Sequence, residues 1–227
     1  DLPVSVGIVL DTSGSMRGSL AQAKGAVRAF FDACNPEDEA FLYTVSTRPM
    51  TNSTFTSDFY TLLSHTLFFG ANGSTALVDT IFAALRQSRA ARNPGKALLV
   101  ISDGMDNHSR YSKSELMAAA EEADLQIYSI SVFDPPPNRK PIGLTEERDG
   151  ISFLQELTRR TGGFQIVARN EEDIQRGAAA IGRAIRNQYV IGYIPKETRS
   201  DGVWHSIKVK LNVPNAVVYA RSGFFAR

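Results

Sequence analysis

The run VSVGIVL at residues 4–10 constrains the fold more than any other stretch of this sequence. Apolar and β-branched residues fill most of its positions, which is typical of a strand that is buried on both faces. A second run of this kind, ALLVI, occupies residues 97–101. Strands buried on both faces belong to parallel sheets that are covered by helices, so these runs predict an α/β protein.

Helical and strand patterns alternate along the chain as far as about residue 187. Apolar spacing, caps and breakers predict helices at residues 15–33, 58–67, 76–92, 112–123, 150–161 and 170–187. β-Prone runs predict strands at residues 39–46, 126–133 and 164–167, with a short edge strand within residues 50–57. The alternation predicts a doubly wound, mostly parallel, Rossmann-like sheet with helices on both faces.

The pattern changes near the C-terminus. Three β segments with no helix between them are predicted at residues 189–194, 203–213 and 217–221. We therefore divide the chain into a main domain, residues 1–187, and an antiparallel β extension, residues 188–227, that packs on the main domain or extends its sheet. The proline-rich residues 134–149 are predicted to form a loop.

Oxygen-bearing side chains follow both buried runs. Asp11, Ser13 and Ser15 come on alternate residues directly after the first run, and Asp103 follows the second. A glycine-punctuated loop brings Thr75 to the start of another helix. Ligands of open α/β sheets bind beyond the carboxyl ends of the strands, and such oxygens suit a hard cation. A turn followed by a serine that caps the next helix is the alternative explanation of the first motif.

These five residues, in this order and topology, resemble the metal-ion-dependent adhesion site of von Willebrand factor type A domains. The surrounding sequences VLDTSGSM, GSTAL and ISDG also look like that family. The resemblance covers about residues 1–187 and implies the fold of that family with a complete metal site. Its implied cofactor is Mg²⁺, with Mn²⁺ or Ca²⁺ as alternatives, and its implied ligands are Asp11, Ser13, Ser15, Thr75 and Asp103.

The resemblance implies a protein-binding module and not an enzyme. In this family the two serine hydroxyls bind the cation directly and the aspartates often act through waters, which leaves the cation able to take an Asp or Glu carboxylate from a partner protein. The net charge of +1 gives no general attraction to nucleic acid or anionic membranes. No apolar run is long enough to span a bilayer, so we expect no membrane insertion.

Further candidate residues lie close to the predicted ligands. Asp79 follows Thr75 by one helical turn and is a candidate for supporting the ligands from behind; a solvated carboxylate on the helix face is the alternative. Asp106 and Asn107, with His108, are candidates for the rim of the site, and an ordinary polar loop is their alternative.

Two other functions stay open at this stage. A phosphatase could use Asp11 as a nucleophile, but no motif places a general acid or base beside it. Some members of the family are intracellular subunits of AAA-type assemblies. The C-terminal pattern, however, is similar to a bacterial, acidobacterial-type subgroup of these domains that is usually exported. We therefore expect an extracytoplasmic protein (secreted, periplasmic or envelope-associated) and a sequence that lacks its native N-terminus.

Overall fold

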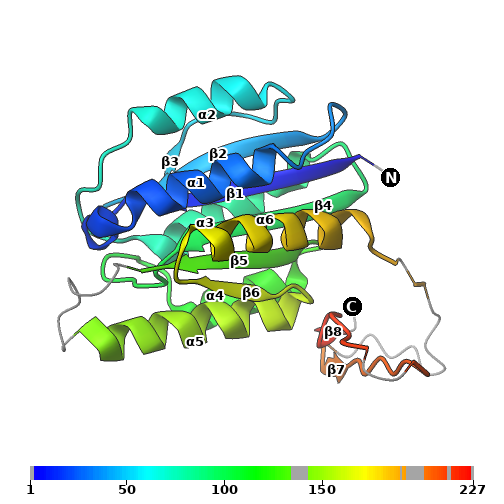
Figure 1. Ribbon diagram of the computed structural model, residues 1–227. Helices are drawn as coiled ribbons and strands as arrows, with labels where there is room; N and C mark the ends of the chain where they lie inside the picture. Colours follow the sequence, from blue (N-terminus) through cyan, green and yellow to red (C-terminus); the bar gives the residue numbers. More distant parts are fainter. Residues whose placement is uncertain (1–2, 134–142, 190, 193–201, 214–215, 226–227) are drawn as a thin grey trace.

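A six-stranded sheet forms the centre of the protein (Figure 1). The computed structural model describes residues 3–133, 143–189, 191–192, 202–213 and 216–225. The strands run in the order β3-β2-β1-β4-β5-β6, and every neighbouring pair is parallel except β3 with β2. Their bounds are β1 Val4–Asp11, β2 Glu39–Val45, β3 Met50–Thr51, β4 Gly95–Ser102, β5 Gln126–Val132 and β6 Gln165–Ala168. The predicted mostly parallel sheet is confirmed.

Helices cover both faces of this sheet and create two apolar cores. One face packs against α1 (Leu20–Phe31), α2 (Phe59–Leu67) and α6 (Glu171–Arg186), and the other against α3 (Leu77–Gln87), α4 (Lys113–Glu122) and α5 (Gly143–Thr161). Successive residues of a strand point to opposite faces, so Leu99 joins the first core while Leu98 and Val100 join the second. This double burial explains the continuous apolar runs in the sequence.

Three helix predictions differ from the structure. The helix predicted at residues 76–92 is α-helical only to Gln87, and a 3₁₀ turn, η2 (Ser88–Ala90), follows it. The helix predicted from residue 15 begins instead as a 3₁₀ turn, η1 (Gly14–Gly18), and α1 starts only at Leu20, because glycines at both ends of that turn disfavour an α-helix. The loop predicted at residues 134–149 is wrong for its last part, since α5 already begins at Gly143. The glutamates and the arginine at residues 146–148 have good helix propensity, which favours this earlier start. Residues 134–142 lie outside the described residues.

The C-terminal extension forms a small sheet of its own. Strands β7 (Trp204–Ser206) and β8 (Gly223–Phe225) pair antiparallel, apart from the main sheet. The longer strand predicted at residues 203–213 is confined to β7, and residues 217–221 are not a strand. Alternating residues alone do not make a strand, because each strand needs a partner to complete its ladder. The strand predicted at residues 189–194 lies largely outside the described residues.

The extension packs on the end of the main domain beside α4 and α5. The backbone N–H of Ser222 donates to the carbonyl oxygen of Arg160 at 3.3 Å. The Arg221 guanidinium donates to the carbonyl oxygen of Glu121. The rings of Phe164 and Tyr219 lie 4.8 Å apart. None of the helices in the described part of the chain is both long and apolar enough to cross a membrane.

Candidate metal centre

The carboxyl ends of β1 and β4 bring the two predicted aspartates to one edge of the sheet. The strands are neighbours, with Leu10 paired to Ile101, so Asp11 lies level with Ser102, and Asp103 follows one residue later at the same edge. Both side chains are buried. Asp103 is close enough to repel the charged form of Asp11 electrostatically. The strand order therefore produces a pair of buried carboxylates from two distant segments of sequence.

The Asp11 carboxyl is fixed by hydrogen bonds to both of its oxygens. The Ser102 hydroxyl donates to Oδ2 at 2.5 Å, and the backbone N–H of Ser13 donates to Oδ1 at 2.9 Å. Burial, and after it the repulsion from the neighbouring Asp103, raise the pKa of Asp11 to about 7, because together they outweigh these hydrogen bonds, which lower it. A cation at this edge would favour the ionised form of both carboxylates, because it replaces repulsion with attraction.

Two serine hydroxyls extend this donor set. The Oγ atoms of Ser13 and Ser15 lie 3.0 Å apart, within hydrogen-bonding distance of each other. Ser13 is buried while Ser15 is exposed, so the pair leads from the buried carboxylates to the surface. Adjacent oxygens around Mg²⁺ lie about 3 Å apart, because the ion holds its ligands octahedrally at ~2.1 Å. The spacing of the two hydroxyls fits one edge of such an octahedron.

Thr75 reaches the same edge through a loop that is tied to the first motif. The backbone N–H of Asn72 donates to the carbonyl of Thr12 at 3.0 Å, and that of Gly14 donates to the carbonyl of Gly73 at 3.0 Å. Gly73 has a φ of 79°. A Cβ at this position would lie 2.7 Å from the hydroxyl oxygen of Ser46 and 2.8 Å from that of Thr47. Only glycine fits this position, which explains the glycine in the sequence before Thr75.

Asn107 holds the backbone of Thr75 on the other side. Its Oδ1 accepts from the N–H of Thr75 at 2.9 Å, and its own N–H donates to the Thr75 carbonyl at 3.0 Å. The N–H of His108 donates to the same carbonyl at 3.0 Å. The structure therefore places Asn107 behind Thr75 as a clamp on its main chain, in addition to its position in the predicted rim loop.

Asp106 caps a helix from a distant segment. The first residues of α3 have no side-chain cap of their own, and the carboxylate of Asp106 accepts from the N–H of Val78 at 2.8 Å. The Ser109 hydroxyl donates to the same carboxylate at 2.6 Å and accepts from the N–H of Asp79 at 3.0 Å. Sequence reasoning missed this cap, because Asp106 lies 28 positions after Val78, whose N–H it accepts from.

Asp79 fastens the loop that follows this cap. Its Oδ1 accepts from the backbone N–H groups of Arg110 and Tyr111 at 2.9 and 3.0 Å. The Asp79 side chain is half-buried, and these two hydrogen bonds hold the backbone of the loop at Arg110 and Tyr111 in place. A role of Asp79 in supporting the metal ligands stays a prediction.

The donor set belongs to a particular class of metal site. In the described parts of the chain, no three His, Cys, Asp or Glu side chains gather as a metal cluster. The predicted site has two carboxylates, and its other predicted donors are the hydroxyls of Ser13, Ser15 and Thr75. Such oxygens suit Mg²⁺ or another hard cation and not zinc. The residues present therefore fit the predicted ion.

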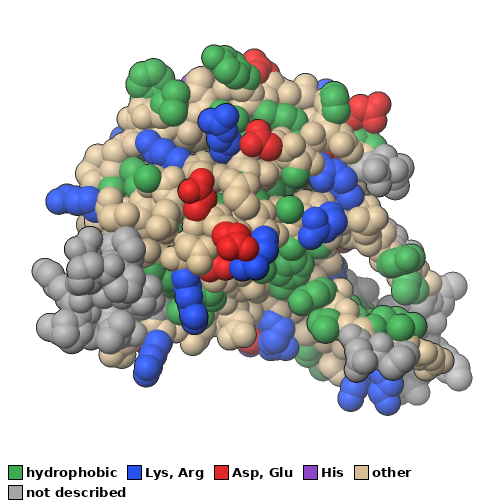
Figure 2. All heavy atoms as spheres, in the orientation of Figure 1, with side chains coloured by type: hydrophobic (Ala, Val, Ile, Leu, Met, Phe, Trp, Pro, Cys, Tyr) green, Lys and Arg blue, Asp and Glu red, His purple; other side chains and the backbone are tan. Residues whose placement is uncertain are grey.

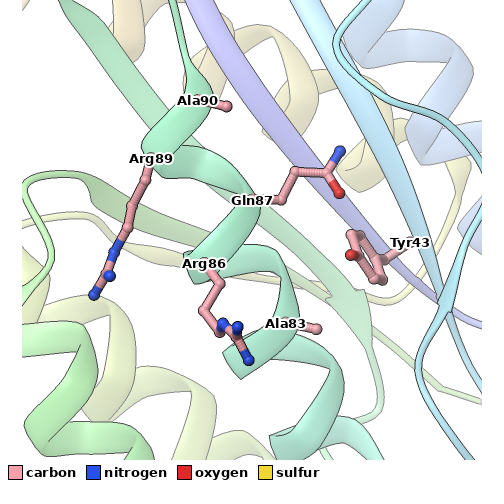
Figure 3. Close-up of a pocket in the computed structure, with 6 residues that line it drawn as sticks. All are labelled: Tyr43, Ala83, Arg86, Gln87, Arg89 and Ala90. Atoms are coloured by element: carbon pink, nitrogen blue, oxygen red, sulfur yellow. The ribbon is translucent and has the colours of Figure 1, made fainter.

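Two shallow hollows flank α3, away from this edge. One of about 630 Å³ lies at the far end of α3 from Thr75, and Figure 3 shows Gln87 and Tyr43 pointing toward one another in it while Arg86 and Arg89 point away. The other hollow, of about 560 Å³, lies between α3 and α4 and is lined by the same two arginines. Neither hollow contains a candidate metal ligand.

Comparisons with known proteins agree with this fold. Residues 6–106 match the family model for the von Willebrand factor type A domain. The structure resembles BatB, a conserved hypothetical protein from Bacteroides thetaiotaomicron, with a TM-score of 0.63 and 20% identity over 82% of this chain and 100% of that one. A search of the curated proteins found no sequence match.

Two further solved structures are similar. A von Willebrand factor type A protein from Catenulispora acidiphila has a TM-score of 0.63 and 16% identity over 100% of this chain and 56% of that one. The vWF domain of the type V pili tip protein Mfa5 from Porphyromonas gingivalis has a TM-score of 0.61 and 12% identity over 86% of this chain and 99% of that one. At these identities the likeness establishes the fold.

Proposed function

We propose that this chain, whose fold is that of a von Willebrand factor type A domain, is a protein-binding module that captures a partner's carboxylate through a divalent cation. The observation that carries the proposal is the meeting of two buried carboxylates and the Ser13–Ser15 hydroxyl pair at one edge of the sheet. Asp11, Ser13, Ser15, Thr75 and Asp103 are its proposed ligands, and Mg²⁺ is the proposed ion.

The chain's own residues determine what such a site can bind. When bound, the cation supplies a positive charge that a donor set rich in neutral hydroxyls does not cancel. Hydrogen bonds from Ser102 and the Ser13 backbone keep the Asp11 carboxyl in place, and Asn107 keeps Thr75 in place. Because Ser15 is exposed, the open side of the site faces solvent, where an Asp or Glu carboxylate of a partner can approach.

We further propose that the domain is not an enzyme. A nucleophile must reach its substrate, whereas the Asp11 side chain is fully buried and both of its oxygens accept hydrogen bonds. Hydrolysis of p-nitrophenyl phosphate that depends on Mg²⁺ and disappears in Asp11→Asn would contradict this.

The similar structures support an extracytoplasmic location. One of them is a pilus tip protein, and another is named as an aerotolerance-related membrane protein from Bacteroides fragilis. A protein-interaction module outside the cytoplasm agrees with both descriptions. We therefore favour this location over membership of an intracellular AAA-type assembly.

Titration calorimetry with MgCl₂ tests the metal site directly. We expect saturable binding by the wild type and its loss in Ser13→Ala. Ser114→Ala is a matched control, because the Oγ atoms of Ser112 and Ser114 lie 2.9 Å apart in the same two-residue spacing but on the exposed start of α4. Equal Mg²⁺ binding by Ser13→Ala and Ser114→Ala would refute the site.

A further inference from the structure

The hollow of about 560 Å³ between α3 and α4 has a composition that suits a particular ligand, and we call it the α3–α4 hollow. Ala119 and Ala123 line it on the side of α4. They are four residues apart, so they share one face of the helix, and their side chains are too short to fill the space beside α3. The volume is within the range of pockets that hold small molecules.

One wall of the hollow is a stripe along α3 and the turn η2 that follows it. Phe82, Arg86 and Arg89 line the hollow, and their spacing of four and three residues places them one above another. Figure 3 shows both arginine side chains pointing away from Tyr43, which lines the other hollow. At about 1.5 Å per residue, the two arginines lie about 6 and 10 Å along the helix from Phe82. The stripe therefore has an aromatic end and a cationic end.

Three cations gather at the end of the stripe that is distant from Thr75. Lys96, the second residue of β4, lines the hollow together with Arg86 and Arg89. In the part of the chain that the structure describes, none of these three side chains forms an ion pair. The cationic end therefore has a positive charge that is not neutralised by ion pairs with described residues.

The opposite face of the sheet carries its charges differently. Figure 2 shows acidic and basic side chains interspersed over the face on which α1 and α6 lie in Figure 1. There Arg28 lies 4.0 Å from Asp32, and Arg176 lies 2.8 Å from Asp173. Exposed arginines of this protein are thus paired on that face and unpaired in the hollow.

The aromatic end of the hollow is a pair of rings in contact. The centroids of Phe82 and Tyr111 lie 4.4 Å apart, with 33° between the ring planes. The backbone N–H of Tyr111 donates to Oδ1 of Asp79 at 3.0 Å, which holds the second ring in place. Half of the Tyr111 surface is exposed. The rings therefore offer a flat surface on which a planar group can stack.

The wall on the side of α4 carries two carboxylates. Glu122 is the last residue of α4, and Asp124 follows it; Oδ1 of Asp124 lies 3.7 Å from the Arg221 guanidinium. Carboxylates accept hydrogen bonds from hydroxyl groups, including those of a sugar. They also repel anions, so the negative group of a ligand lies on the side of α3.

We infer that the α3–α4 hollow binds a nucleoside monophosphate. The phosphate lies at Arg86, Arg89 and Lys96, because a phosphate monoester carries about −1.5 to −2 charges at pH 7 and arginine binds it through paired N–H groups. The base stacks on the two rings, and the ribose hydroxyls donate to the carboxylates of α4. Phosphate alone leaves the rings unused, and a nucleoside alone leaves the cations unpaired. This site is separate from the proposed metal centre.

Titration calorimetry in EDTA at low salt tests the inference, because EDTA prevents a cation at the metal centre from holding the phosphate. The probes are adenosine 5′-monophosphate, adenosine and ribose 5-phosphate. We expect saturable binding of the monophosphate and at least tenfold weaker binding of the other two, the effect of losing a charge-assisted hydrogen bond or a stacked base. Arg86→Gln/Arg89→Gln should weaken binding of the monophosphate about tenfold or more and leave adenosine unchanged. Tyr111→Ser should remove the preference for the monophosphate over ribose 5-phosphate.

A matched variant controls for net charge. Arg28→Gln/Arg176→Gln removes two exposed arginines from the opposite face and should keep the affinity for adenosine 5′-monophosphate within about twofold. Melting temperatures close to that of the wild type show that the variants are folded. The inference is overturned by an absence of saturable binding, by equal affinity for ribose 5-phosphate, or by equal losses in the two arginine variants. None of these outcomes changes the Mg²⁺ titration that tests the proposed function.

Discussion

At the scale of single residues, the buried carboxyl of Asp11 makes the stability of the fold depend on pH. Its pKa is raised to about 7 in the folded protein from 3.8, so the folded state holds the proton more tightly than the unfolded state. Stability from this group is complete below pH 4 and is lost as the pH rises toward 7. Ionising this buried carboxylate near neutral pH therefore costs stability, and a cation bound beside it would reduce that cost.

Asp11→Asn should remove that cost and the metal site together. In EDTA at pH 8, we expect the variant to be more stable than the wild type by about 1–3 kcal/mol, the scale of an unfavourable buried polar group. We also expect the wild type, but not the variant, to be more stable at pH 5 than at pH 8. Urea denaturation with and without MgCl₂ measures both effects. Asp32→Asn, an exposed carboxylate, is the control; a loss of stability in Asp11→Asn would count against this account.

Asn107 allows a second prediction at this scale. Asn107→Ala removes the acceptor for the N–H of Thr75, so we expect Mg²⁺ affinity to fall by about 10–100-fold, as for other residues that orient ligands. Asn107→Asp keeps an acceptor oxygen and should retain more affinity. Calorimetry measures the series, and Asn187→Ala, an exposed asparagine at the end of α6, should have no effect. Unchanged affinity in Asn107→Ala would remove Asn107 from the ligand-positioning set.

At the scale of elements, helix starts that depend on nearby residues could be predicted from the sequence, whereas contacts between segments far apart in the sequence could not. The Ser112 capping box starts α4, and the Asn170 side chain caps α6, both close to where the sequence predicts helix starts. The cap on α3 could not be predicted, because Asp106 comes from another loop. The extent of the C-terminal strands failed for the same reason, since strand pairing depends on segments far apart in sequence.

The amino end of the sheet is closed by an ion pair between elements. The Asp38 carboxylate accepts from the N–H of Val4 at 3.0 Å, from the N–H of Asn35 at 2.8 Å, and from the Arg186 guanidinium at 2.7 Å. Asp38 is buried and Arg186 nearly so. One side chain therefore joins β1, the turn before β2, and the end of α6.

Asp38→Ala should loosen all three elements. Removing one partner of a buried pair costs about 3–5 kcal/mol, because the other charge and two N–H donors lose their acceptor. Urea denaturation should show this loss, while Mg²⁺ affinity of the folded variant should stay unchanged, since the pair lies at the end of the sheet opposite the metal site. Asp32→Ala, from the exposed pair with Arg28, should cost less than 1 kcal/mol. An equal cost for both substitutions would show that the clamp adds no stability.

At the scale of the whole molecule, the sequence predicts the sheet and its site better than the surface around them. The five proposed ligands could be predicted from the sequence, because motif order and strand order together place Asp11, Ser13, Ser15, Thr75 and Asp103 at one edge of the sheet. The exposure of Tyr60, Leu67 and Phe68 could not be predicted, because it depends on how α2 packs on α1. In the proposed function, the residues around the cation determine which partner binds, since a cation cannot distinguish one carboxylate from another.

Positive charge beside the site should speed the approach of an acidic partner. Arg17 follows Ser15 in η1, and Arg48 follows Thr47, whose hydroxyl accepts from the N–H of Ser74 at 3.3 Å. Both arginines are exposed and flank the loop that carries Thr75. Long-range attraction between such charges and an acidic segment raises association rates and is screened by salt.

We therefore expect Arg17→Glu/Arg48→Glu to slow association of an acidic peptide that binds in MgCl₂ by about tenfold at 50 mM NaCl, and by much less at 500 mM, with a smaller effect on dissociation. Biolayer interferometry in MgCl₂ separates the two rates. Arg86→Glu/Arg89→Glu makes the same change in net charge at the far end of α3, so it controls for the overall charge of the protein (Figure 3). If both double variants slow association equally, net charge and not the placement of Arg17 and Arg48 governs the encounter.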